Sequence, residues 1–402
     1  MKVLLVNAGV YKKGAVQTLT NTIILEHEKY AKDGLELFFY SSNIEDYEIN
    51  KKYRKTNFLY CKILKIYKFF DKLIYNLIKI LKKDKALSHR MDFSALYYIN
   101  NLKKYLRKID FDLIIFENYV PLFLALKNRK LYEKYKGKYI YHVHNKPTHN
   151  AGCKNIILNS SAFYCISKYV ANCITSSDSK IGKVKNEKIR IFKNCIDTNL
   201  FRPIVAFENP IYNNFHSRDE KIILFAGRIS PEKGIRETIL AFNMIKNIKV
   251  RLVIVGTAFY GMKLKMNYEK EIFNLCKNNK QISLTGFVEY ENMPYYYNMA
   301  DVIVLPSIWE EPAGMTMIEA MSCGKTIITT NVGGIKEYTE DKAILVNNNS
   351  NIVENLHKEI MNVLNNPKKY EEFGKKAREH IIANYSKENY YKKFVELVRE
   401  QD

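Results

Sequence analysis

Two glutamates eight positions apart, Glu311 and Glu319, are the residues of this sequence whose setting best suits ligand binding. An apolar run at 302–305 precedes them and predicts a buried parallel strand. Gly314 lies between them and leaves room for a ligand to approach the backbone. A helix is expected over 315–322, so one carboxylate precedes the helix and the other lies about two turns further on.

The start of that expected helix adds hydrogen-bond donors. The first amides, at Met315 and Thr316, have no partner within the helix and suit a phosphate or sugar oxygen. Glu319 can accept hydrogen bonds from two neighbouring hydroxyls, such as those of a ribose. By spacing alone, however, a solvated pair of glutamates is the simpler explanation.

A second polar group follows the apolar run at 222–226. Gly227, Arg228 and Lys233 lie in a short loop before a stretch with helical periodicity at 235–245. A flexible glycine, a planar guanidinium and an ammonium form a cationic grip that suits a diphosphate. An exposed loop with unrelated basic residues would look similar.

The first strand, at 3–6, leads into a loop that carries Gly14 and Ala15 and then into a helix that runs to about residue 32. A glycine loop between a strand and a helix is a general anion-binding arrangement of α/β sheets. The loop lacks the Gly-x-Gly-x-x-Gly pattern, so a dinucleotide fold is not indicated. An ordinary tight turn explains the loop nearly as well.

Polar residues also end two further expected strands. Glu117 and Asn118 follow one strand, and His142 and His144 lie at the end of the next. Two histidines at this spacing point to the same face of a strand, which is compatible with a metal pair. No nearby Asp or Cys completes such a site, so we expect no metal here.

The second half of the chain alternates strands and helices, which predicts a doubly wound parallel sheet. Its expected strands are at 222–226, 250–255, 282–284, 302–305, 326–329 and 344–346.

Composition favours two domains. A chain of 402 residues with 47% apolar residues exceeds the usual size of one core, and no apolar run is long enough to span a membrane. The seven cysteines are scattered, which suits a reducing cytoplasm. No signal peptide is expected, because Met1 and Lys2 lead directly into a strand.

The formal charge of +22 is concentrated in one segment. Residues 51–108 contain 17 Lys or Arg and 3 acidic residues, a net charge of +14. A cationic amphipathic helix is expected over 58–83, with five lysines near one face: Lys62, Lys65, Lys72, Lys79 and Lys83. Such a helix could bind anionic lipid, or its apolar face could pack on the sheet. No nucleic-acid recognition motif accompanies it, and no nucleic-acid partner is expected.

The context of the glutamate pair resembles a known signature. Pro306 and Ser307 precede it, and Gly333, Gly334 and Glu337 follow it. The whole pattern resembles the Glu-x7-Glu signature of the retaining glycosyltransferases of family 4. The loop from Gly227 to Gly234 is similar to that family's Gly-Arg-x4-Lys-Gly, and residues 194–203 are similar to its Asn-Gly-Val-Asp-x3-Phe-x-Pro, with Cys195 in place of the glycine.

The resemblance implies an α/β GT-B fold, in which two Rossmann-like doubly wound domains face a cleft. It places an acceptor-side domain at 1–205, a nucleotide-sugar-binding domain at 206–384, and a helix that returns to the first domain at 385–402.

It also implies roles for individual residues. His144 would reach the donor sugar, Glu311 would orient its hydroxyls, Arg228 and Lys233 would hold its phosphates, and these four form the expected catalytic group. The donor-binding residues would be Gly14, Ala15, Gly227, Gly256, Val288, Gly314, Met315, Thr316 and Glu319.

The implied reaction is transfer of a hexosyl or N-acetylhexosaminyl group from a nucleotide-diphosphate sugar, with retention and without a metal cofactor. The run at 307–312 looks most similar to that of UDP-sugar users. The expected acceptor is a glycan or lipid-linked glycan of surface polysaccharide or lipopolysaccharide synthesis, and the expected location is the cytoplasm and the inner face of the cell membrane. A GT-B nucleotide-sugar epimerase and a non-catalytic membrane-binding subunit are the alternatives.

Overall fold

The computed structural model describes residues 1–7, 15–30, 34–42, 53–81, 93–215, 220–246, 248–257 and 267–401, with the backbone alone at 15, 75–81 and 267. These residues form two compact units, Met1–Lys193 with Tyr390–Asp402, and Asn194–Asn389. The sequence placed the boundaries at 205 and 384. The first division falls earlier because residues after Lys193 already bond within the second unit: Asn194 N donates to the Tyr338 hydroxyl at 2.9 Å and Ile196 N to Tyr385 O at 2.8 Å.

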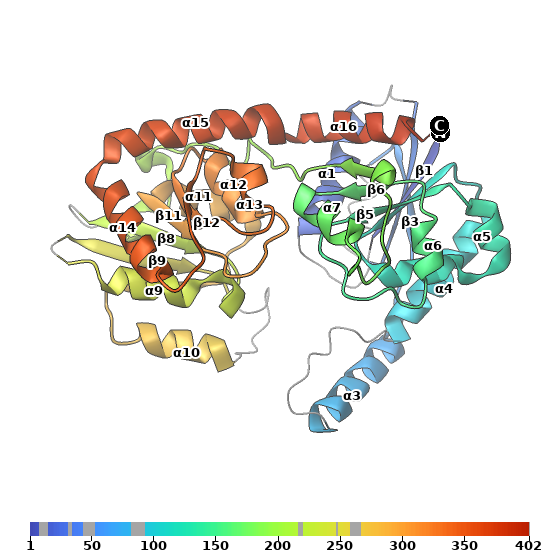
Figure 1. Cartoon of the computed structure of the whole chain (residues 1–402), viewed down its shortest axis with the longest axis horizontal. Helices are drawn as coiled ribbons and strands as arrows, with labels where there is room; N and C mark the ends of the chain where they lie inside the picture. The colour runs from blue at the N-terminus through green and yellow to red at the C-terminus, as the bar shows by residue number, and fades with distance from the viewer. Residues whose placement is uncertain are drawn as a thin grey trace. The chain divides into compact units, whose positions relative to one another are not determined.

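The first unit is built on a seven-stranded parallel sheet in the order β3-β2-β1-β4-β5-β6-β7 (Figure 1). The central strands are apolar and buried along almost their whole length, as expected for a sheet covered on both faces. The strands are β1 (Lys2–Val6), β2 (Glu36–Ser41), β3 (Thr56–Tyr60), β4 (Leu113–Glu117), β5 (Tyr139–Val143), β6 (Phe163–Cys165) and β7 (Ile189–Ile191).

Helices connect these strands, and the last helix of the chain, α16, also packs on this unit. On α16, the Tyr391 hydroxyl lies 2.8 Å from Nδ1 of His27 in α1, and Leu397 O accepts a hydrogen bond of 2.7 Å from the Tyr164 hydroxyl of β6. The helices are α1 (Ala15–Lys29), α3 (Lys65–Leu81), α4 (Phe93–Lys108), η1 (Val120–Lys127), α5 (Arg129–Tyr135), α6 (Lys154–Leu158), α7 (Lys168–Thr175), η2 (Asn186–Lys188) and α16 (Lys387–Arg399).

The helix predicted over 58–83 starts later than expected. Residues Thr56–Tyr60 form the edge strand β3, paired in parallel with β2, and α3 begins at Lys65. The prediction was wrong at this end because the aromatic and apolar residues of β3 fit a strand as well as a helix face, and pairing with β2 decides between them. In Figure 1, α3 extends away from the sheet, and Asp71 joins it to α4 by accepting from the Phe93 amide at 2.8 Å.

The second unit contains a six-stranded parallel sheet in the order β10-β9-β8-β11-β12-β13, as its alternating pattern predicted. Helix α9 covers one side of this sheet, and α12 and α15 lie on the other (Figure 1). The strands are β8 (Lys221–Ala226), β9 (Val250–Val255), β10 (Ile282–Gly286), β11 (Val302–Leu305), β12 (Ile327–Thr330) and β13 (Ile344–Val346).

The helices of the second unit follow the same alternation, and the expected helix over 315–322 is present as α12. The short helices are η3 (Ala206–Glu208), α8 (Tyr212–Phe215), η4 (Pro231–Lys233), η5 (Tyr290–Asn292) and α13 (Ile335–Thr339). The longer ones are α9 (Ile235–Asn243), α10 (Asn267–Cys276), α11 (Met293–Met299), α12 (Met315–Ser322), α14 (Ile352–Asn365) and α15 (Pro367–Tyr385).

Gly234 joins the loop after β8 to helix α9 and brings it against the end of β11. Its φ is +68°, and a Cβ added here would lie 2.0 Å from Pro306 O. The left-handed backbone and the close approach both require a glycine. The contact between Gly234 and Pro306 therefore sets the distance between Lys233, the preceding residue, and the loop that follows β11.

We expect Gly234→Ala to lower the free energy of unfolding of the protein by about 2 kcal/mol or more, through backbone strain plus the clash with Pro306. Gly286→Ala is the matched control, because Gly286 has a φ of +74° but no atom within 4 Å of an added Cβ, so only the strain of about 1 kcal/mol remains. Denaturant unfolding of both variants measures the difference. Equal losses would show that contact with Pro306 does not constrain this loop.

Candidate functional site

The carboxylate of Glu311 is the centre of a polar cluster in the second unit. Its Oε2 accepts from Lys233 Nζ at 2.5 Å, Trp309 Nε1 at 3.0 Å and Ser307 Oγ at 3.2 Å. The side chains of Lys233 and Glu311 are 21% and 14% exposed, so the pair is shielded from solvent but still accessible. Lys233 Nζ also lies 6.0 Å from the centroid of the Trp309 ring. The structure thus brings together two residues that the sequence assigned to the catalytic group.

Arg228 lies in the same loop as Lys233 but does not join this cluster. Its guanidinium pairs with Glu232 at 3.3 Å, and its side chain is 41% exposed. An exposed ion pair of this kind contributes little stability, so it can be exchanged for an anionic ligand at small cost. The guanidinium of Arg228 is therefore accessible to an anionic ligand.

Helix α12 begins immediately after this cluster, with Gly314 as its N-cap and no side-chain cap. Within the described part of the chain, the Met315 and Thr316 amides have no hydrogen-bond partner. They carry the positive end of the helix dipole. The donors expected from the sequence are therefore present on one short segment.

Glu319 has a different environment from Glu311. It is buried, with 6% of its surface exposed, and its Oε2 accepts from the Tyr297 hydroxyl at 2.7 Å. Burial raises the pKa of Glu319 to about 7, and the hydrogen bond from Tyr297 opposes the rise in part. This carboxyl is therefore poised between its neutral and ionised forms near neutral pH. The sequence did not indicate Tyr297 as its partner.

The remaining expected donor residues of the second unit lie at the carboxyl ends of neighbouring strands. Gly227 N donates to Val255 O at 3.0 Å, and Gly256 N donates to Gly286 O at 2.9 Å. A Cβ on Gly256 would lie 1.8 Å from Gly227 O, so the two backbones are in close approach. Val288 lies in the loop after β10 and is partly exposed.

Not all predicted residues of the first unit can be placed. Gly14 lies outside the described residues, and Ala15 is described only as the first residue of α1. His144 is described, and it lies directly after β5 with 4% of its surface exposed.

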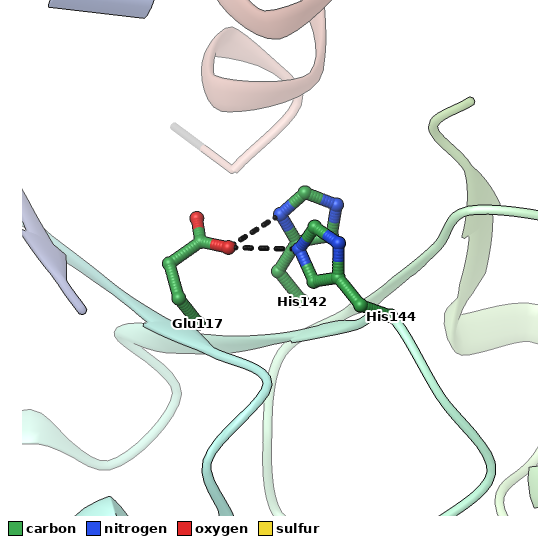
Figure 2. Close-up of side chains that lie close together, drawn as sticks. All are labelled: Glu117, His142 and His144. Atoms are coloured by element: carbon green, nitrogen blue, oxygen red, sulfur yellow. Dashed lines mark hydrogen bonds and ion pairs between the residues drawn. The ribbon is translucent and has the colours of Figure 1, made fainter. Parts of the chain in front are cut away.

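His144 is part of a buried cluster that the sequence analysis did not assemble. One oxygen of Glu117, Oε2, lies 2.9 Å from His142 Nδ1 and 3.0 Å from His144 Nε2 (Figure 2). The sequence analysis considered only Asp or Cys as a third partner and did not connect Glu117 with the histidines, which parallel pairing of β4 and β5 places opposite one another. The three ligand atoms lie within 4.8 Å of one another, which is also compatible with a divalent cation.

The environment of the cluster shifts the pKa values of Glu117 and His144. Burial alone would raise the pKa of Glu117, but the imidazoles of His142 and His144 outweigh burial and hold that pKa well below its usual range. Burial and the neighbouring His142 lower the pKa of His144, against the opposing effect of Glu117. At neutral pH, Glu117 is therefore ionised and His144 is uncharged.

Comparison with known proteins locates a family region in the second unit. Residues 209–380 match the family described as glycosyl transferases group 1. The chain is 29% identical over 192 residues to lipopolysaccharide 1,2-N-acetylglucosaminetransferase of Salmonella typhimurium, covering 46% of this chain and 49% of that protein. It therefore spans about half the length of that relative. It is 26% identical over 337 residues to the putative glycosyltransferase YtcC of Bacillus subtilis, covering 78% and 80%.

Solved structures extend the similarity in fold to the whole chain. HepE of Anabaena, solved in complex with UDP and glucose, superposes with a TM-score of 0.73 at 15% identity and covers 100% of both chains. With two parallel, Rossmann-like sheets and such neighbours, the chain has the α/β GT-B fold of glycosyltransferases, and its second unit carries a region that matches glycosyl transferases group 1.

Proposed function

We propose that this protein is a retaining glycosyltransferase that moves a hexosyl or N-acetylhexosaminyl group from a UDP-sugar to a glycan or lipid-linked glycan of surface polysaccharide or lipopolysaccharide synthesis. The observation that carries the proposal is the cluster of Lys233 and Glu311 beside the amino end of α12, within the region that matches glycosyl transferases group 1. The Salmonella relative is a lipopolysaccharide N-acetylglucosaminetransferase, which supports the proposed acceptor class. The Anabaena structure contains UDP and glucose, which supports a UDP-sugar as the donor.

The second unit supplies the charges that the reaction needs. Departure of the nucleoside diphosphate builds negative charge, which Arg228, Lys233 and the first amides of α12 would stabilise more in the transition state than in the ground state. Glu311 would orient a sugar hydroxyl, and Glu319 would accept from the ribose. Because Arg228, Lys233 and these amides would balance the charge of the phosphates, we propose that the transfer is independent of metal ions.

Nucleotide release by the purified protein tests the proposal. We expect UDP release from one of UDP-glucose, UDP-galactose and UDP-N-acetylglucosamine in the presence of EDTA, increased by a lipid extract that contains the acceptor, and none from GDP-mannose. Loss of one charged hydrogen bond costs about 1.5–3 kcal/mol, so Arg228→Ala should lower kcat/KM by roughly ten- to a hundredfold. Lys277→Ala, an exposed lysine on the same unit, is the control and should have no effect.

The other outcomes separate the alternatives. Release that is restored only by Mn²⁺ would contradict the metal-free mechanism. Conversion of the donor to its epimer without an acceptor would indicate an epimerase. Silence from every donor, together with lipid binding, would favour a non-catalytic subunit.

The pKa of Glu319 predicts a pH dependence of donor binding. Ribose hydroxyls donate to the ionised carboxylate, so binding requires deprotonation and should tighten as pH rises through about 7. From pH 6 to pH 8 the ionised fraction rises about tenfold, and UDP affinity should rise about tenfold with it. Fluorescence of Trp309, the single tryptophan, measures the binding because its indole donates to Glu311.

Glu319→Gln supplies the comparison for that experiment. The amide can still accept from Tyr297 but does not titrate, so its UDP affinity should be weaker at pH 8 and nearly constant with pH. A wild-type affinity that does not change between pH 6 and pH 8, or unchanged activity in the variant, would remove Glu319 from the donor site.

We also propose that helix α3 binds an anionic membrane surface. The sequence allowed two arrangements of this helix, binding to lipid or packing of its apolar face on the sheet. Among its described side chains, Ile66, Phe69, Phe70 and Leu73 are 42–62% exposed, so these four do not pack on the sheet. Four exposed lysines accompany them: Lys65, Lys68 and Lys72 on the helix, and Lys62 just before it. Exposed apolar and cationic side chains on one helix match the chemistry of an anionic bilayer. Lys79 and Lys83 lie outside the described side chains, and none of the described helices is long and apolar enough to cross a membrane.

Sedimentation with vesicles tests the membrane proposal. We expect binding to vesicles that contain phosphatidylglycerol, weakened by salt and absent with pure phosphatidylcholine. Each lysine near the surface contributes about 1 kcal/mol, so changing Lys62, Lys65, Lys68 and Lys72 to Gln should abolish most binding. The matched control changes four exposed lysines of α15 to Gln: Lys368, Lys369, Lys375 and Lys376. Equal binding by both variants would rule out α3 as the contact surface.

A further inference from the structure

The shared oxygen of Glu117 determines where the protons of two imidazoles lie. Glu117, His142 and His144 are 2%, 1% and 4% exposed, so water does not compete for these bonds. A carboxylate only accepts hydrogen bonds, so each nitrogen that faces it must carry a hydrogen. His142 must therefore carry its hydrogen on Nδ1, and His144 on Nε2. The opposite nitrogen of His144, Nδ1, is then left with its lone pair.

Those opposite nitrogens have no partner in the described part of the chain. Nε2 of His142 is fully buried and unpaired. His144 donates from its backbone amide to Asn118 Oδ1 at 3.1 Å and bonds through Nε2 to Glu117, so among the described residues its Nδ1 has no partner. In Figure 2, Nδ1 of His144 lies on the side of the ring away from Glu117.

The backbone around the cluster keeps the rings in place. Asn118 has a φ of +50°, an uncommon value for a residue other than glycine. Its amide donates to His142 O at 2.9 Å, and its carbonyl accepts from the Tyr141 hydroxyl at 3.0 Å. This conformation turns the chain directly after Glu117 and places the Asn118 side chain against the amide of His144. The strained turn therefore ties the ends of β4 and β5 together.

Aromatic rings enclose His142 on its other side. The ring centroid of Phe192 lies 5.2 Å from that of His142, and Tyr390 stacks on Phe192 at 4.3 Å. The nearby Tyr164 hydroxyl is already bonded to Leu397 O. In the described part of the chain, the contact with Glu117 Oε2 is the polar contact that satisfies His142 Nδ1.

We propose that Glu117 and His142 are positioning residues that present His144 Nδ1 as a fixed hydrogen-bond acceptor for a substrate hydroxyl. The proposal rests on the glycosyltransferase function proposed above, because that function supplies a sugar hydroxyl. Glu117 sets the tautomer of His144 directly. His142 acts through Glu117, by holding the shared oxygen in position.

This arrangement selects the kind of group that His144 can bind. An uncharged imidazole with a free lone pair accepts from a hydroxyl, whereas phosphate binding would need a protonated, cationic ring. The group that donates to His144 is therefore a neutral hydroxyl of the substrate rather than a phosphate.

The same three residues could instead bind a divalent cation, and the two arrangements exclude each other. Metal binding needs lone pairs on the nitrogens that face Glu117, whereas the hydrogen-bonded arrangement needs hydrogens there. The separations of 2.9 and 3.0 Å are ordinary hydrogen-bond lengths. They favour the hydrogen-bonded arrangement, and a bound metal ion would overturn it.

Long-range ¹H–¹⁵N spectra of the full-length protein, labelled with ¹⁵N-histidine, test the proposal without depending on activity. The resonances are assigned by single His→Asn variants at the eight histidines. We expect the Nδ1–H tautomer for His142 and the Nε2–H tautomer for His144. The Nε2–H form of His142, the Nδ1–H form of His144, or one equivalent of tightly held metal that His142→Asn releases would each overturn the proposal.

Variants then test positioning. Glu117→Gln keeps an oxygen acceptor, so the tautomers and most activity should remain. Glu117→Leu removes the acceptor, so the His144 tautomers should mix and kcat should fall by roughly ten- to a hundredfold, with UDP binding to the second unit unchanged. Glu133→Gln, at an exposed glutamate of α5, is the control and should change neither.

Substrate contact has its own measurement. Saturation with the active UDP-sugar and acceptor should shift the Nδ1 resonance of His144, and no shift would overturn its role as an acceptor. If no sugar is transferred at all but the tautomers are as expected, the proposed function fails while the arrangement of the cluster stands. Loss of kcat in Glu117→Leu with unchanged tautomers would assign Glu117 a purely structural role.

Discussion

The parallel direction of all paired strands is the constraint on which both units depend. Parallel strands place their carboxyl ends at one edge of a sheet, and each needs a crossover that starts there. The polar residues discussed above follow this rule. Glu117 ends β4 and His144 follows β5 in the first unit, while Gly227 and Gly256 follow β8 and β9 in the second. Each sheet therefore gathers, at one edge, residues that are distant in sequence.

The two buried carboxylates show how local partners decide the charge of a site. Glu117 and Glu319 are both almost fully buried, and burial by itself raises the pKa of each. Two imidazoles outweigh burial at Glu117, so it remains ionised. A single neutral phenol, Tyr297, does not outweigh burial at Glu319, so its pKa stays near 7. Glu117 is therefore suited to holding its two histidine neighbours in place, and Glu319 to changing its protonation state when a ligand binds.

The sequence predicted the features that local residues determine. The loop with Arg228 and Lys233, the helix after Gly314 and the strands of the second unit are all encoded in short runs, and each is found where expected. The pairing of Glu117 with His142 and His144 was missed because 27 positions separate Glu117 from His144, and only the register of β4 against β5 brings them together. The same holds for Tyr297 and Glu319, which are 22 positions apart. The start of α3 was placed too early because edge pairing of β3 is also a long-range property.

The polar residues of the two units differ in charge. In the second unit, Lys233 is held 2.5 Å from Glu311, so its charge is partly balanced before any phosphate arrives. A phosphate that approaches must therefore compete with Glu311, and it gains most when its own negative charge is greatest, as it is when a diphosphate departs. In the first unit, the cluster around His144 offers an acceptor without positive charge. The polar residues of the two units therefore suit different groups, an anion at Arg228 and Lys233 in the second unit and a neutral hydrogen-bond donor at His144 in the first.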